Sequence, residues 1–268
     1  MKIVFLHMTM GITNRGSEVV IDNLASALTE KHEVMVIQAG IAQQKSYRVA
    51  RVYPLEKAPT VAPLGGIDQL LFRLHLDSAS RHVIMFTQKA KSALTRFNPD
   101  IIVAVNGPCQ LAILQKLNLR AKIVVFGHAG IGYHDRDNLK LRPDLFIALT
   151  PRALDWASNL SYASTKVVYI PNPVKSLKPR KVKLNLPNPI ILTVSALSKY
   201  KNVDKVAGAI KNLPYSWLLI GDGEERVNIL DRLSQLANNF RWLREVDQSE
   251  IANYYHSSDV FCFVPQSQ

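Results

Sequence analysis

The sequence predicts an α/β protein of two domains, each built on a mostly parallel sheet flanked by helices. Short apolar, β-rich runs alternate with stretches of helical periodicity along the 268 residues, a pattern typical of βα repeats. Near the middle, a segment rich in proline and lysine and poor in apolar residues interrupts this alternation, which then restarts. We therefore predict a first domain over 1–172, a linker over 173–189 and a shorter second domain over 190–268.

In the first domain, apolar runs predict strands at 2–7, 33–38, 47–53, 100–105, 122–126, 144–149 and 166–170. A helix is expected after Gly16, where apolar residues recur at helical spacing, and another at 110–117. The span 67–97 is expected to form one long helix with an apolar stripe and basic residues on its other faces.

In the second domain, strands are expected at 190–195, 216–220, 240–243 and 260–264, with helices at 203–211, 224–237 and 248–256. The last of these strands runs into a polar turn, Pro265 to Gln268. Ligands of open α/β sheets bind outside the carboxyl ends of the strands. A binding loop should therefore begin where this chain stops, and we expect the second domain to be incomplete.

The net charge of +12 is spread over both halves of the chain. Such a charge suits anionic partners, namely a nucleotide diphosphate, an acidic lipid surface or nucleic acid, although solubility alone also accounts for it. No apolar run reaches the roughly 18 residues that span a bilayer, and the apolar start is too short for a signal peptide. Cys109 and Cys262 lie far apart in apolar surroundings and are expected to be packed thiols, which favours a cytoplasmic location.

Three loops are rich in residues that bind anions or sugars. Gly16 and Ser17 open a helix after the first strand, where free amide groups and the helix dipole attract phosphate, although Ser17 alternatively serves as a helix cap. Gly221, Asp222 and Gly223 follow a second-domain strand and form either an anion or ribose site or a tight turn that needs glycine.

The third loop places His128 at the carboxyl end of a first-domain strand, as a structural hydrogen-bonding residue or a catalyst. His134, Asp135 and Asp137 follow, but their spacing matches no metal site. The sequence contains no Gly-x-Gly-x-x-Gly, Walker or Gly-x-Ser-x-Gly motif, which argues against a dinucleotide enzyme, a P-loop ATPase and a serine hydrolase.

Taken in order, four stretches resemble glycosyltransferase family 4, whose members have the GT-B fold of two Rossmann-like domains. They are Arg15–Val20 with the following helix and His32-Glu33-Val34; Ile170-Pro171-Asn172-Pro173-Val174; Val194–Leu197 with Lys201-Asn202-Val203-Asp204; and Leu219–Gly223 with Tyr254-Tyr255 through Pro265.

This resemblance implies a retaining glycosyltransferase with a UDP- or GDP-linked sugar as donor and an unidentified sugar, lipid or small molecule as acceptor. It implies that Gly16 contacts the donor diphosphate, that Lys201 neutralises it, and that His128 lies beside the transferred sugar. Ser17, Ser195 and the 221–223 loop are expected among the substrate-binding residues. No metal or other cofactor is expected, because lysine and backbone dipoles take the place of a metal.

Two departures from the family pattern stand out. Ser195-Ala196-Leu197 stands where many members have Gly-Arg-Leu, which removes one cation from the diphosphate site. The paired glutamates of the family are expected just after Gln268, so the chain looks truncated at its C-terminus, and we expect this form to be impaired in turnover.

Two alternatives remain open. One is a non-catalytic basic protein that contacts acidic membrane through the span 67–97; the other is a sugar-nucleotide epimerase of the same fold. A nucleic-acid module is disfavoured, because no aromatic stacking set is found. Acceptor loops are expected around Val52–Gly66, where no pattern is interpretable.

Overall fold

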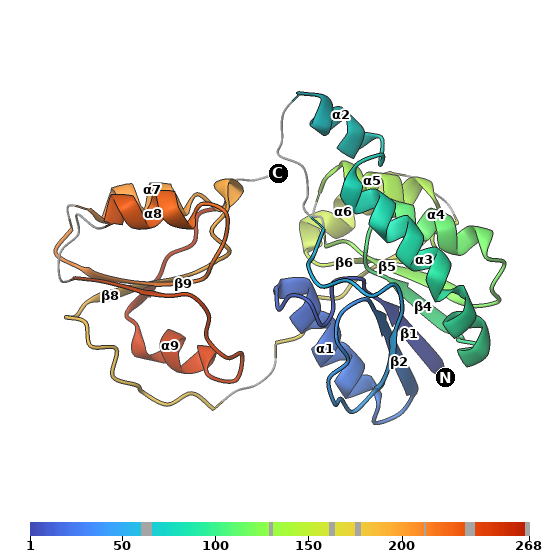
Figure 1. Ribbon diagram of the computed structural model, residues 1–268, viewed down its shortest axis with the longest axis horizontal. Coiled ribbons are helices and arrows are strands. Elements are labelled where there is room, and N and C mark those ends of the chain that lie inside the picture. The colour runs from blue at the N-terminus through green and yellow to red at the C-terminus, as the bar shows by residue number, and fades with distance from the viewer. Residues whose placement is uncertain are drawn as a thin grey trace. The chain divides into compact units, whose positions relative to one another are not determined.

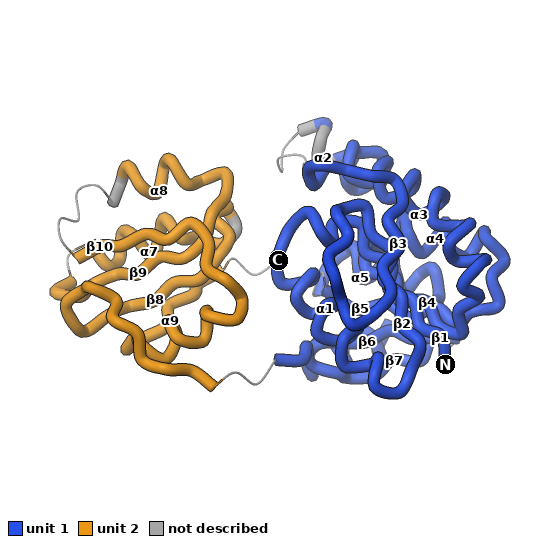
Figure 2. Tube along the Cα trace, turned by 60° about the horizontal axis from the view of Figure 1, so that its bottom comes forward, with its two compact units in different colours: residues 1–175 blue, residues 176–268 orange. Residues whose placement is uncertain are grey.

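The computed structural model describes residues 1–59, 66–128, 131–160, 164–174, 178–211, 213–233 and 239–265. The chain divides into two compact units, residues 1–175 and 176–268, which Figure 2 colours separately. Each unit contains one parallel sheet, and each is described by itself below. Two loops considered in the sequence lie partly outside the described residues: the region Val52–Gly66, at 60–65, and the loop that contains His128, at 129–130.

Unit 1 is built on a parallel sheet whose described strands follow the order β3-β2-β1-β4-β5-β6-β7. The strands are β1 (Lys2–Leu6), β2 (Glu33–Gln38), β3 (Arg48–Arg51), β4 (Ile101–Ala104), β5 (Lys122–Phe126), β6 (Leu145–Ala148) and β7 (Lys166–Tyr169). Each was expected from an apolar run. The run is clearest for the central strands, because these are buried on both faces, whereas β3 and β7 are edge strands and are partly exposed. Their carboxyl ends meet at one edge, where the predicted loops begin (Figure 1).

Helices cover both faces of this sheet (Figure 1). One face packs on α1 (Gly16–Leu28), which contributes Ile21 and Ala25 to a core with Phe5 and Val36. The other packs on α3 (Ser78–Phe97), α4 (Pro108–Lys116), α5 (Tyr133–Lys140) and α6 (Pro151–Asn159). Because successive strand residues point to opposite faces, neighbours such as Val4 and Phe5 belong to different cores.

The single helix expected over 67–97 is wrong, because the structure has two helices there. The first, α2 (Gly66–Arg73), ends before His75, which adopts a positive φ of 57°. Asp77 then caps α3, and its carboxylate accepts a hydrogen bond from the Ser80 amide at 3.1 Å. An aspartate N-cap stabilises a new helix start, so the apolar periodicity continues while the backbone turns.

Unit 2 contains a parallel sheet with the order β10-β9-β8-β11 among its described strands. These are β8 (Ile190–Val194), β9 (Ser216–Ile220), β10 (Phe240–Leu243) and the short edge strand β11 (Val260–Phe261). The helices are α7 (Val203–Ile210), α8 (Arg226–Leu233) and α9 (Ile251–Ser257), with a 3₁₀ turn, η1 (Lys199–Lys201), before α7. Strand β11 is thus shorter than the run 260–264 expected from the sequence.

Helices α7 and α8 pack on one face of this sheet around Trp217, and α9 packs on the other. Part of the segment assigned to a linker lies on that second face, where Leu184 is buried beside Ile190 and Leu192. The amide of Arg180 donates to the Asn253 side chain at 2.9 Å. These contacts anchor the segment to unit 2.

Among the described residues, no helix combines the length and apolar character needed to cross a bilayer.

Candidate functional site

In unit 1, the loop that follows β1 leads into α1 at the carboxyl edge of the sheet. Arg15 is the N-cap of α1 and makes no side-chain cap hydrogen bond. The capping role considered for Ser17 is therefore wrong, because Ser17 is the second residue of the helix and its hydroxyl donates to Glu18 at 3.0 Å. A Cβ placed on Gly16 would meet no atom within 4 Å. Open space beside the first turn of a helix suits an anion.

Glu18, which sequence reasoning did not select, is buried at the centre of this loop. Its carboxylate accepts hydrogen bonds from the hydroxyls of Thr9 at 2.6 Å and Thr13 at 2.7 Å. Burial raises the pKa of Glu18, but nearby His7 and these hydroxyl donors outweigh it, so the pKa lies below its ordinary value. An acidic residue in the first turn of a helix is a weak sequence signal; its burial is visible only in the fold.

His7, at the end of β1, is a second residue that the sequence did not reveal. It is almost fully buried, and its Nε2 atom has no hydrogen-bond partner among the described residues. Burial lowers the pKa of His7 to about 4; the charge of Glu18 opposes this effect and His128 adds to it. His7 is therefore neutral at physiological pH.

His128 lies where the sequence predicted, just beyond the carboxyl end of β5. Its ring stacks on Phe126, with centroids 5.4 Å apart and planes at 15°. Its Nε2 atom likewise lacks a hydrogen-bond partner among the described residues. Burial lowers the pKa of His128, and Glu18 exerts an opposing effect. The structure thus brings His128 into the electrostatic range of Glu18, at the same edge of the sheet as the Gly16 loop.

The histidine and aspartates that follow His128 have other surroundings. His134 packs against Phe72 and Tyr133, with ring centroids at 4.9 and 4.7 Å. Asp135 is buried, and this burial raises its pKa to about 7. Asp137 pairs with Lys140 at 2.7 Å. In the part of the chain that the structure describes, no group of three or more His, Cys, Asp and Glu side chains is placed to hold a metal ion.

In unit 2, two loops meet at the carboxyl ends of β8 and β9. The amide of Leu197 donates to the Asp222 carbonyl at 3.0 Å. Gly221 has a φ of +145°, and a Cβ there would lie 1.8 Å from the Ser195 carbonyl oxygen. A Cβ on Gly223 would lie 2.3 Å from the Leu197 carbonyl oxygen. Both glycines are therefore required by the close approach of two backbones.

The side chains of these two loops are already engaged within unit 2. Asp222 forms ion pairs with Arg244 at 2.7 Å and Arg226 at 3.5 Å. The hydrogen bond from Arg244 is the main cause that lowers the pKa of Asp222. The Ser195 hydroxyl donates to the carbonyl of Ala196 at 3.0 Å. The structure thus brings Ser195, Asp222 and the two glycines together at one sheet edge.

Lys201 ends the turn η1, close to the same edge of this sheet. Its ammonium group lies 5.1 Å from the ring centroid of Phe263, within cation–π range. The next residue, Asn202, adopts a left-handed conformation, and its side-chain amide donates to the Val264 carbonyl at 3.0 Å. These contacts hold the lysine turn against the segment that follows β11.

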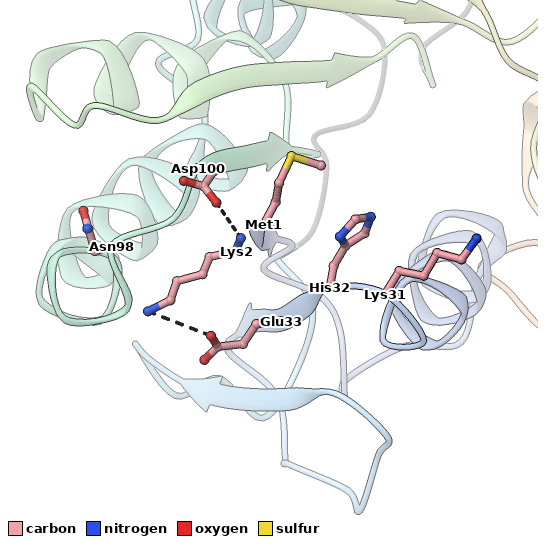
Figure 3. A pocket seen from close by; sticks show the side chains of 7 residues that line it. All are labelled: Met1, Lys2, Lys31, His32, Glu33, Asn98 and Asp100. Atoms are coloured by element: carbon pink, nitrogen blue, oxygen red, sulfur yellow. Dashed lines mark hydrogen bonds and ion pairs between the residues drawn. The ribbon is translucent and has the colours of Figure 1, made fainter.

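The hollow drawn in Figure 3 lies elsewhere in unit 1. It is lined by residues at the amino ends of β1 and β2, including Lys2 and Glu33, whose charged groups are 3.9 Å apart. The predicted site residues of unit 1 lie at the carboxyl ends of these strands. We therefore do not assign the hollow to the candidate site, since ligands of open parallel sheets bind at the carboxyl ends.

Comparisons with known proteins bear on both units. Residues 14–176 match the family described as Glycosyltransferase Family 4, and residues 174–267 match the one described as Glycosyl transferases group 1. No curated protein matches the sequence.

The fold is similar to several solved structures. Anabaena HepE in complex with UDP and glucose superposes with a TM-score of 0.64 at 17% identity, over 99% of this chain and 74% of that one. An E. coli trehalose-6-phosphate structure bound with UDP-2-fluoro glucose gives 0.66 at 14% identity, over 99% and 78%. The pneumococcal O-GlcNAc transferase GtfA in complex with UDP and GlcNAc gives 0.64 at 12% identity, over 99% and 79%. These likenesses establish the fold and confirm the predicted GT-B-like α/β class.

Proposed function

Because the chain belongs to glycosyltransferase family 4, we propose that it moves a sugar from a UDP- or GDP-linked donor to an acceptor with retention of anomeric configuration. The observation that carries this proposal is the succession of the two family matches, 14–176 and 174–267, over two parallel-sheet units. The loops considered above lie at the carboxyl edge of each sheet, where ligands of such sheets bind.

In unit 2, we propose that Lys201 neutralises the donor diphosphate and that Ser195 and the 221–223 backbone bind the rest of the nucleotide sugar. The glycines let the 221–223 backbone pack against Ser195 and Leu197, which fixes the path of the loop at this edge. Position 196 is alanine, so an arginine is missing there, but Asp222 holds Arg226 and Arg244 beside the loop. Positive charge therefore remains close to the proposed phosphate contacts.

In unit 1, we propose that the first turn of α1, at Gly16 and Ser17, binds a phosphate and that His128 contacts the transferred sugar. A neutral imidazole with a free Nε2 atom can donate or accept a hydrogen bond to a sugar hydroxyl. Neither a metal nor another cofactor is needed in this scheme, since lysine and amide dipoles stabilise the leaving diphosphate. The donor phosphate itself takes the proton of the acceptor hydroxyl, which accounts for retention without a protein nucleophile.

Donor binding can be measured by calorimetry with UDP, GDP and the corresponding sugar nucleotides. We expect one of the two diphosphates to bind and Lys201→Ala to weaken it by about 10- to 100-fold, the worth of one charged hydrogen bond. Lys205→Ala is the matched control, because Lys205 is an exposed lysine of α7. Equal affinities in the two variants, or no uptake by the unaltered chain, would contradict the proposed donor site.

Transfer and its stereochemistry need a second assay. Incubation with the bound sugar nucleotide and a panel of acceptors, followed by NMR of the anomeric proton, shows whether the product keeps the donor's configuration. An inverted product would refute retention. A changed sugar nucleotide formed without any acceptor would instead identify an epimerase.

A second proposal is that the protein works at an acidic membrane surface of the cytoplasm. Helix α2 exposes Ile67 and Leu70 at 75 and 55% of their surfaces, at i and i+3 on one face, and Leu74, just beyond its last residue, is 56% exposed. The exposed basic residues of α2 and α3 are Arg73, Arg81, Lys89, Lys91 and Arg96. An apolar helix face flanked by basic residues favours acidic lipid. Both cysteines are free thiols, as expected in a reducing compartment.

Vesicle sedimentation tests this contact. We expect binding to phosphatidylglycerol vesicles that weakens as salt rises, because screening reduces attraction between exposed charges. Leu70→Gln with Leu74→Gln should abolish most of it, whereas Ile41→Gln, at an exposed apolar position outside α2, should not. Binding that persists in the double variant would refute this face as the contact.

A further inference from the structure

The buried carboxylate of Glu18 connects the loop after β1 to helix α1. Three hydroxyls point to it: those of Thr9 and Thr13 in the loop and that of Ser17 in the first turn of the helix. A buried carboxylate is costly unless hydrogen bonds surround it, and bonds to a charged acceptor are the strong ones. Glu18 therefore acts as the common acceptor that closes residues 9–17 on themselves.

The same carboxylate is a negative charge that acts on two imidazoles. His7 faces Glu18 and His128, and the Thr9 hydroxyl lies 3.4 Å from His7 Nδ1. The charged group that acts on His128 is Glu18. For both histidines the carboxylate opposes burial, because it favours the protonated ring. Both rings carry an Nε2 atom without a hydrogen-bond partner among the described residues.

We propose that Glu18 is a positioning residue: it holds the Gly16 loop in the shape that receives a phosphate and sets the electrostatic environment of His7 and His128. The phosphate and sugar roles of the loop and His128 rest on the proposed function; the network itself does not. If Glu18 only filled space, a glutamine of the same size would replace it without any effect on the fold. A positioning role needs both the negative charge of Glu18 and the length of its side chain.

Two conservative variants separate these requirements. Glu18→Gln keeps the length of the side chain and removes its charge, whereas Glu18→Asp keeps the charge and shortens the reach. Glu33→Gln is the control, because Glu33 is a partly exposed glutamate that pairs with Lys2 and Arg48. All are made in the full chain, so that the fold of unit 1 is tested in the protein as it exists.

The need for the charge of Glu18 is tested by NMR, in which the imidazole signals of histidine-labelled protein are followed as the pH is changed. The chain contains seven histidines, and His128→Gln and His7→Gln assign the two that matter. We expect the midpoint of His128 to fall in Glu18→Gln and to stay near the unaltered value in Glu18→Asp and Glu33→Gln. An unchanged midpoint in Glu18→Gln overturns the electrostatic role.

The need for the length of the Glu18 side chain is tested by amide hydrogen exchange in the loop. There the amides of Ile12 and Thr13 donate to the Thr9 carbonyl at 3.1 Å. We expect these amides to exchange about tenfold faster in Glu18→Asp, as the loss of about one hydrogen bond to a charged acceptor implies, and no faster in Glu33→Gln. Unchanged exchange in Glu18→Asp overturns the loop-closing role. Neither measurement uses a ligand. If calorimetry detects no binding of UDP, the proposed function is refuted, but the role of Glu18 in the loop is not.

Discussion

Replacing the buried Asp135 by asparagine should stabilise unit 1 increasingly as the pH rises. The folded-state pKa of about 7 lies well above the ordinary value of 3.8. Between these values the unfolded chain releases a proton that the folded chain keeps, so the unaltered protein loses stability as pH rises. Three pH units correspond to about 4 kcal/mol at about 1.36 kcal/mol per unit, and Asp135→Asn should escape this loss.

The asparagine also introduces a cost that does not depend on pH. Its oxygen can keep the 3.4 Å contact with the Asn138 side chain. Its amide group, however, brings donors into a buried position beside Gly127, at about 1–3 kcal/mol if they stay unpaired. The informative quantity is therefore the trend of the stability difference with pH, and its absolute value at one pH decides nothing.

Hydrogen exchange by mass spectrometry at several pH values, corrected for intrinsic exchange rates, reports the opening free energy of core peptides in β4 and β5. We expect the opening free energy of the variant, relative to that of the unaltered protein, to increase between about pH 4 and pH 7 and then to stay constant. Asp155→Asn, at an exposed position of α6, is the matched control. A difference that stays constant across this range would refute the argument that Asp135 is held neutral by burial.

Three further predictions concern single residues of the two units. Gly221→Ala should destabilise unit 2 by about 3 kcal/mol or more, because the new Cβ would collide with a backbone carbonyl. Gly208→Ala, in open space on α7, should instead stabilise unit 2 by about 1 kcal/mol. Urea titrations, together with hydrogen exchange of peptides in β8 and β9, compare the stability of the two glycine variants. His7→Gln should remove a loss of about 3 kcal/mol that the unaltered protein suffers between about pH 6.5 and pH 4, where only the unfolded histidine takes up a proton; a flat difference over that range would contradict it. Tyr47→Phe should cost about 1.5 kcal/mol, because the tyrosine hydroxyl donates to the Asp22 carboxylate at 2.6 Å; unchanged urea stability would show that this bond contributes nothing.

Most of the sheet was predictable because buried parallel strands are continuous apolar runs, a signal that a single sequence displays directly. The runs at 33–38, 122–126 and 216–220 coincide with β2, β5 and β9. Helices α5 and α6 were missed, since α5 is short and polar and carries little periodicity. A signal for α6 did exist: Thr150 caps it and Pro151 follows at the first helical position.

The site was less predictable than the fold. Residue type and spacing pointed to Gly16 and His128, but nothing in the sequence shows that Glu18 and His7 are buried together. Burial of a charged group depends on how the chain folds around it, here on the loop after β1, whose Thr9 and Thr13 hydroxyls reach Glu18. The same reason left the role of Gly221 open, because the backbone that approaches it comes from another strand.

The interlock of the two unit 2 loops has a consequence for redesign. Since Gly221 and Gly223 fit against main-chain atoms, the path of this edge does not depend on which side chains neighbouring positions carry. Substitutions at an exposed position of this edge, such as Glu224, should then leave the backbone path unchanged while both glycines are retained. Replacing the whole loop would remove both glycines and with them the close fit to the Ser195 and Leu197 carbonyls.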